Sequence, residues 1–210
     1  MYAINHAATA LILKKQEPSA PIWPLLISTQ VLELFWVFFN YMGIEHFSVV
    51  DGKLHLDFLP YSHSVFSAFV LALLSYGIIR WIFKNRKLAF VFAIGVISHL
   101  VLDLIFHEKD ILLSPFSSRP AWGFGIIDFP ILNFILELAY GIFCWWYFKG
   151  SRALLITIII LNLVDLPVML SSGKALDIFV SHPALLPSFI LFQIIYTWYF
   201  IARFSKKKIS

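Results

Sequence analysis

The chain has 210 residues, of which 60% are hydrophobic and only 13% are charged. A soluble domain carries about 25% charged residues, and this shortfall excludes a soluble enzyme, a secreted disulfide scaffold and a disordered protein. The mean hydropathy of +0.83 instead indicates a membrane protein. The single cysteine, Cys144, lies in an apolar run. Because there is only one cysteine, the chain can form neither an internal disulfide nor a cysteine-based zinc site.

Six apolar stretches are long enough to cross a bilayer, which takes roughly 20 mostly apolar residues in a helix. They are residues 22–41, 61–83, 88–106, 129–148, 153–170 and 184–202. Residues 1–13 are also apolar, but as a helix they span only about 20 Å of a hydrocarbon core of about 30 Å. The sequence therefore predicts one all-α integral membrane domain with six transmembrane helices and a short, half-inserted N-terminal helix.

Basic residues gather at one set of ends of these stretches. They are Lys14, Lys15, Arg80, Lys84, Arg86, Lys87, Lys149, Arg152, Arg203, Lys206, Lys207 and Lys208. The positive-inside rule places these ends, and with them the C-terminus, in the cytoplasm. The same rule accounts for the net charge of +4, so a nucleic-acid partner is not expected.

Four carboxylates interrupt the apolar stretches: Glu33, Asp103, Glu137 and Asp165. Each charged group at a helix centre costs roughly 2.5 to 3.5 kcal/mol on insertion scales. Protonation, polar partners on other helices or a bound cation must offset that cost. All seven histidines fall in the predicted outer half of the bundle or in its outer loops, which favours a cation site on that side.

The spacing of His99 and Asp103 gives the sharpest local pattern. Residues four apart lie on one helix face, one turn apart, where an imidazole and a carboxylate can share a metal ion. His107 follows by another four residues. His63 begins the preceding span and is expected either to meet this pair or to bond water at the interface, and Glu33 is expected to be a further ligand or the partner of a protonated histidine.

Later helices carry a second polar pattern. Glu137 follows Asn133 by one helical turn and is predicted to orient a ligand or to act as a general base. Asn162 and Asp165 form a similar stripe, for which interhelical hydrogen bonding is the simpler interpretation.

The succession of motifs resembles the YdjM-like bacterial inner-membrane proteins, described as membrane-bound metal-dependent hydrolases. The resemblance covers residues 1–115 and rests on His6 in Asn-His-Ala-Ala, His63 in Pro-Tyr-Ser-His-Ser, the pair His99 and Asp103, and Ile-Leu-Leu-Ser-Pro at residues 111–115. That family is distantly similar to zinc-dependent phospholipase C, and this similarity implies phosphoester chemistry.

Together these observations predict a bundle that holds one or two divalent ions, with zinc as the expected metal, in a pocket open to the periplasmic face of a bacterial inner membrane. The expected ligands are His6, Glu33, His63, His99 and Asp103. Glu137, or Asp57 in an outer loop, is expected to handle the proton in hydrolysis of a lipid or lipid-linked ester or phosphoester.

Two other functions fit the same residues. A small transporter would use the intramembrane histidines and acids to relay protons or to bind a transported cation. An assembly protein would use them only to tie helices together.

Overall fold

The computed structural model describes the chain outside residues 51–52, 171–175 and 206–210. Side chains are also left undescribed at Val50, Lys53, Leu56, Asp57, Val168 and Met169. The predicted cytoplasmic residues Lys206, Lys207 and Lys208 therefore lie outside the described part, as does the side chain of Asp57, a predicted proton-handling group.

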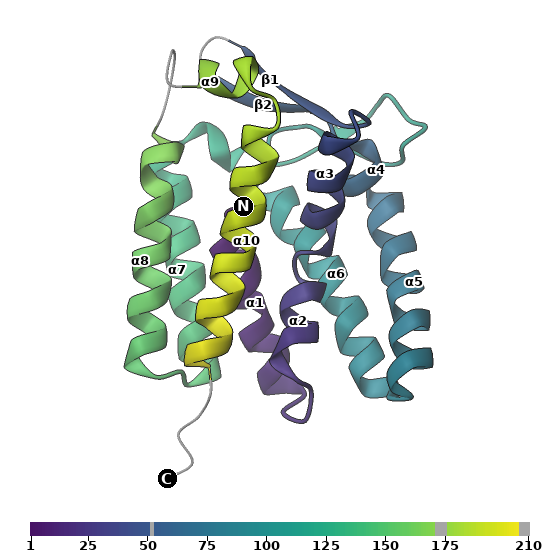
Figure 1. Ribbon diagram of the computed structural model, residues 1–210, viewed down its shortest axis with the longest axis vertical. Helices are drawn as coiled ribbons and strands as arrows, with labels where there is room; N and C mark the ends of the chain where they lie inside the picture. Colours follow the sequence, from purple (N-terminus) through teal and green to yellow (C-terminus); the bar gives the residue numbers. More distant parts are fainter. Residues whose placement is uncertain (51–52, 171–175, 206–210) are drawn as a thin grey trace.

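Most of the described chain forms a bundle of roughly parallel and antiparallel helices (Figure 1). The helices are α1 (Ala3–Gln16), α2 (Ile22–Ser28), α3 (Val31–Tyr41), α4 (Pro60–His63), α5 (Val65–Phe83), α6 (Arg86–Phe106), α7 (Pro130–Phe148), α8 (Arg152–Met169), α9 (Asp177–Ser181) and α10 (Leu185–Phe204). The ends of α1 and α10 and the turns α5–α6 and α7–α8, which carry the predicted cytoplasmic basic residues, lie together at one end. Which side of a membrane this end faces stays a prediction.

The prediction of six spans is confirmed only in part. Within the described residues, α5, α6, α7 and α10 are long and apolar enough to cross a membrane, and α2 with α3 makes a fifth span if the bent pair is counted as one. The predicted span 22–41 breaks after Ser28 and bends by 56°. The predicted span 61–83 is also divided, because Ser64 adopts an extended conformation and caps α5 through the backbone N–H of Ser67.

The N-terminal helix α1 lies in the middle of the bundle. Its residues from Ala3 to Leu11 are all buried, and it packs against α2, α6, α7, α8 and α10. Four alanines among its buried residues allow the surrounding helices to approach closely. The helix starts near mid-height and ends at the basic end (Figure 1), so it reaches half-way through the bundle as the sequence predicted, but as a core element.

Strands at the opposite end make the all-α prediction incomplete. Strand β1 (His46–Val50) pairs antiparallel with β2 (Lys53–Phe58), and β3 (Ile111–Leu112) pairs with β4 (Ala121–Trp122). The second sheet and the short 3-10 helix η1 (Ile126–Asp128) lie on the end of α6, where Gly125 N–H donates to the carbonyl of His107. These elements cap the end of the bundle at which the predicted site lies.

The break between α2 and α3 is a polar joint. Gln30 Nε2 donates to the carbonyl of Ala3 in α1, and Trp198 Nε1 of α10 donates to Gln30 Oε1. Helix α2 approaches α6 so closely at Ser28 that a Cβ added to Gly95 would lie 2.1 Å from Ser28 Oγ. The joint therefore holds α1, α6 and α10 in fixed positions around the carbonyl groups that the break exposes.

Candidate metal centre

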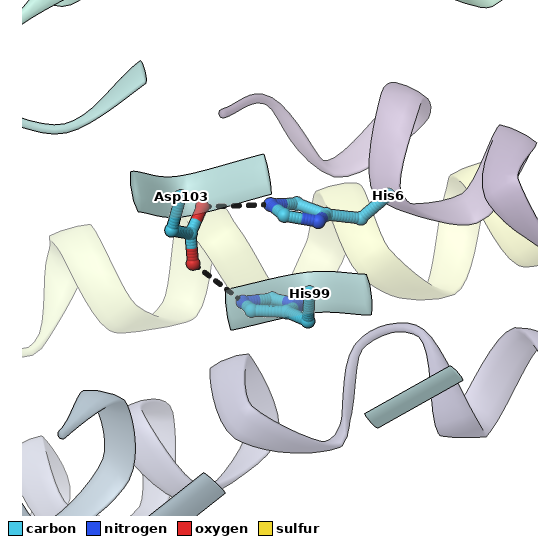
Figure 2. Close-up of side chains that lie close together, drawn as sticks. All are labelled: His6, His99 and Asp103. Carbon is cyan, nitrogen blue, oxygen red and sulfur yellow. Dashed lines mark ion pairs between the residues drawn. The ribbon is translucent and has the colours of Figure 1, made fainter. Parts of the chain in front are cut away.

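The structure brings together all five side chains that were predicted as metal ligands. His6 comes from α1, Glu33 from α3, His63 from α4, and His99 and Asp103 from α6. Figure 2 shows His6 and His99 next to each other on the same side of Asp103, with each histidine aimed at a different one of the two carboxylate oxygens. The two imidazole rings stack with their centroids 3.8 Å apart.

Three donor atoms from three helices form a nearly equilateral triangle. His63 Nε2 lies 3.3 Å from His99 Nε2, and Glu33 Oε2 lies 3.6 Å from each of these nitrogens. Ligands bound tetrahedrally to Zn²⁺ at about 2.0 to 2.1 Å lie about 3.3 Å apart. The triangle therefore has nearly the dimensions of one face of a zinc tetrahedron. A second group with suitable spacing joins His6, His99 and Asp103.

The break between α2 and α3 sets the orientation of His99. The Thr29 carbonyl, at this break, lies 2.7 Å from His99 Nδ1. A carbonyl can only accept, so Nδ1 carries the hydrogen and donates it, and the lone pair of the ring is on Nε2. That nitrogen faces Glu33, His63 and Asp103.

A serine and a buried glutamate orient His63 in the same way. Ser62 Oγ donates to Glu45 Oε2 at 2.6 Å and lies 2.7 Å from His63 Nδ1. Because the hydroxyl hydrogen is directed at Glu45, the imidazole donates from Nδ1 and keeps its lone pair on Nε2. Burial raises the pKa of the Glu45 carboxyl, although hydrogen bonds from Ser62 and Tyr61 act in the opposite direction.

Buried polar atoms of this cluster lack the hydrogen bonds that such atoms normally make. Both ring nitrogens of His6 and Oδ2 of Asp103 have no hydrogen-bond partner, although the two residues are each only 1% exposed. Buried polar groups are nearly always satisfied, and the exceptions need an explanation. A cation fits these atoms, because all the unsatisfied groups have lone pairs to donate.

A cavity of about 360 Å³ lies beside the cluster. His6, Glu33 and His107 are on its wall, together with Glu137. The remaining lining is largely apolar and includes Leu170, Leu176, Leu186, Phe189 and Ile190. A molecule in this cavity would therefore contact both carboxylate and imidazole groups and hydrocarbon side chains.

Of the two residues predicted to handle a proton, the structure describes the side chain of Glu137 but not that of Asp57. Glu137 is buried on the cavity wall, where its carboxylate accepts hydrogen bonds from Tyr2 N–H and Asn5 Nδ2, both at 2.9 Å, and from Asn133 Nδ2 at 3.2 Å. These bonds fix the first turn of α1, which carries His6. Asp57 falls in β2, but its side chain lies outside the described residues, so its role stays a prediction.

Sequence reasoning missed the groups that orient the ligands. Thr29 acts through its backbone carbonyl, which no side-chain pattern reveals, and Glu45 acts through Ser62 from a loop distant in sequence. The run of polar residues from Ser28 to Gln30 inside an apolar stretch is the signal that could have marked the break. The stripe of Asn162 and Asp165 forms interhelical hydrogen bonds, as predicted, with Asn5 and Gln193.

Comparison with known families identifies the chain. Residues 60–174, more than half of its length, match the family described as YdjM inner membrane protein. The chain belongs to the YdjM inner membrane protein family. It is therefore a membrane protein, in agreement with its apolar helices.

The match confirms the family that the sequence resembles, although residues 60–174 overlap only in part with residues 1–115, on which the resemblance rested. The matched region contains His63, His99, Asp103 and Glu137, and it leaves His6 and Glu33 outside. No curated protein and no solved structure matches the chain. The distant similarity to zinc-dependent phospholipase C thus stays a prediction.

Proposed function

We propose that this protein is a metal-dependent hydrolase that acts on a lipid or a lipid-linked ester or phosphoester at the outer face of the bacterial inner membrane. The observation that carries the proposal is the triangle of Glu33 Oε2, His63 Nε2 and His99 Nε2, with sides of 3.3 to 3.6 Å. Two histidines and one glutamate are a known ligand set of catalytic zinc sites. A divalent ion in this position would act as a Lewis acid on the scissile ester or phosphoester.

Residues around the triangle have separate roles in this proposal. Thr29 and Ser62 hold the two imidazoles with their lone pairs toward the ion. Asp103 Oδ2, 3.0 Å from His99 Nε2, provides a further donor. Glu137, on the cavity wall, fixes the first turn of α1 and takes up a proton during the reaction. Asp57 is the alternative proton acceptor.

The cavity supports a lipid-like substrate. Leucines and two phenylalanines share its wall with five acidic residues, Glu33, Glu108, Asp110, Asp128 and Glu137. A polar headgroup would lie against the histidines and carboxylates, and an acyl or prenyl chain against the apolar side chains. Within the described part of the chain no lysine or arginine lines this cavity, and the Met1 amino group on its wall is paired with Asp103, so a divalent cation would be the main attraction for a phosphate group.

Turnover in detergent tests this proposal. The purified protein, without any ion gradient, should hydrolyse phospholipids or lipid-linked phosphates in mixed micelles, and His99→Ala should lose both bound metal and activity. The exposed residue His182 provides the matched control, so His182→Ala should behave as the wild type. Activity that survives in His99→Ala, or stoichiometric metal that survives with activity lost, would contradict the ligand assignment.

The bent pair α2–α3 favours a transporter as the second candidate. Interrupted helices expose backbone carbonyls that bind transported ions, and this break lies beside the buried acids and histidines. Transport would give substrate flux in sealed vesicles that collapses with the proton gradient, whereas a hydrolase needs no gradient. Flux without hydrolysis would replace the hydrolase proposal with this one.

A further inference from the structure

Two groups of donor atoms in the metal centre require the same nitrogen. One group is Glu33, His63 and His99, and the other is His6, His99 and Asp103. Since His99 donates its Nδ1 hydrogen to the Thr29 carbonyl, its ring has one lone pair, on Nε2. One lone pair binds one ion. An ion in the first group therefore leaves His6 without a metal ion; the ring is buried, neither of its nitrogens makes a hydrogen bond, and its Nε2 faces Asp103 Oδ1 at 3.1 Å.

The carboxylate of Asp103 resolves this competition, because its two oxygens face different histidines. Oδ2 lies 3.0 Å from His99 Nε2 and 3.5 Å from His63 Nε2, next to the first group. Oδ1 lies 3.1 Å from His6 Nε2 and 3.6 Å from His107 Nε2. Two ligands held about 2.0 to 2.2 Å from one ion are at most about 4 Å apart, so Oδ1 is close enough to each of these nitrogens to share an ion with it.

His107 has the surroundings of a metal ligand. It ends α6 one turn after Asp103, is 8% exposed, and lies on the cavity wall. Its Nδ1 lies 3.2 Å from Asp110 Oδ2, a carboxylate that accepts the ring hydrogen and directs the Nε2 lone pair toward Asp103. His107 thus has the same arrangement of an orienting acceptor on one nitrogen and a free lone pair on the other as His99.

We propose that a second divalent cation binds between His6 Nε2, His107 Nε2 and Asp103 Oδ1, and that Asp103 bridges it to the ion held by Glu33, His63 and His99. The inference rests on the proposed function, which supplies the first ion. His6, His107 and Glu33 all line the cavity, so a substrate there would be next to both ions. Two nitrogens and one carboxylate oxygen suit Zn²⁺ and also bind Mn²⁺.

Counting bound Mn²⁺ and measuring its magnetic coupling test the proposal. The detergent-purified full chain, stripped with a chelator, is titrated with Mn²⁺, and its electron paramagnetic resonance spectrum is recorded at saturation. The wild type should bind two ions per chain and give the spectrum of a coupled pair. His107→Ala should bind one ion and give the spectrum of an isolated ion.

The neighbouring histidine of the cavity wall is the matched control. His55 lines the same cavity but pairs with Glu108 and not with Asp103. His55→Ala should keep two coupled ions. A second variant, His63→Ala, should also retain one uncoupled ion, now in the other position, so the proposal does not depend on the folding of a single variant.

The result that would overturn the second site differs from the result that would overturn the proposed function. The Met1 amino group lies 3.3 Å from Asp103 Oδ1. If this group alone neutralises the charge on Oδ1, the wild type will bind one ion. That result would overturn the second site but leave the proposed hydrolase intact. Two uncoupled ions would overturn the bridging role of Asp103. No bound ion in the wild type would overturn the second site and the proposed function together.

Discussion

Two clusters of buried polar side chains occupy this bundle, and they differ in whether their polar atoms are paired. In the metal centre, His6 and Asp103 leave three buried atoms without a hydrogen bond. In the amide network, formed by Asn5, Glu137 and Asn162, the Glu137 carboxylate accepts from three donors and the two asparagines bond each other. Both clusters cross between helices, and both contact α1.

The difference shows that burial of a polar side chain is a weak sign of ligand binding, whereas an unsatisfied buried lone pair is a stronger one. Hydrogen bonds within the amide network already offset the loss of water around its members. The donor atoms of the metal centre face one another instead, and lone pairs that face one another repel unless a cation or a proton lies between them. Four substitutions test this contrast.

The largest effect is expected from removing the carboxylate of Asp103. Asp103→Ala should leave no stoichiometric metal by elemental analysis and reduce hydrolysis at least about 100-fold, because losing only a residue that orients a ligand already costs 10 to 100-fold. Asp165→Ala is the control, since this carboxylate is also buried but bonds Gln193. Equal metal loss in both variants would abolish the distinction between the clusters.

The second-largest loss of activity is expected from replacing Glu137, which belongs to the amide network and also lines the cavity beside the metal centre. Glu137→Gln should retain bound metal and lower kcat about 100-fold with little change in KM, as for loss of a general base. Asn133, whose Oδ1 has no hydrogen-bond partner, can accept the new amide hydrogen. Unchanged kcat would assign the proton to another group, and loss of metal would make Glu137 only a positioning residue for His6.

Removing the hydroxyl group that orients His63 should have an intermediate effect, on the affinity for the metal ion. Ser62→Ala removes the hydroxyl that accepts from His63 Nδ1, so the affinity for Zn²⁺ in a competition titration should fall about 10 to 100-fold. Ser64→Ala is the control, because that hydroxyl caps α5 and has no bond to His63. Similar affinities in the two serine variants would show that Ser62 does not orient the ligand.

The smallest effect is expected within the amide network. Asn162→Ala should lower the free energy of unfolding in detergent by about 0.6 kcal/mol, the average for an interhelical hydrogen bond in a membrane protein, and by no more than about 1.7 kcal/mol, the largest such value. Metal affinity should change less than about twofold. Thr157→Ala, which removes a bond only to its own helix, serves as the comparison. A large loss of metal in Asn162→Ala would mean that the two clusters act as one.

The class of the protein and the local part of the site follow from the amino-acid sequence alone. Composition gave the membrane class, and the helical repeat placed His99 and Asp103 on one face, because both depend only on residues close together in the chain. The same local reasoning gave the polar stripe of Asn162 and Asp165.

Which of these polar residues face one another depends on how the helices pack. The break after Ser28 bends a stretch that reads as one continuous span, and only the packed bundle brings the Thr29 carbonyl to His99. Helical periodicity gives the face on which a side chain lies but not the helix that covers that face. Because hydrogen bonding between helices depends on that neighbour, it took the fold to separate the satisfied Glu137 from the unsatisfied His6 and Asp103.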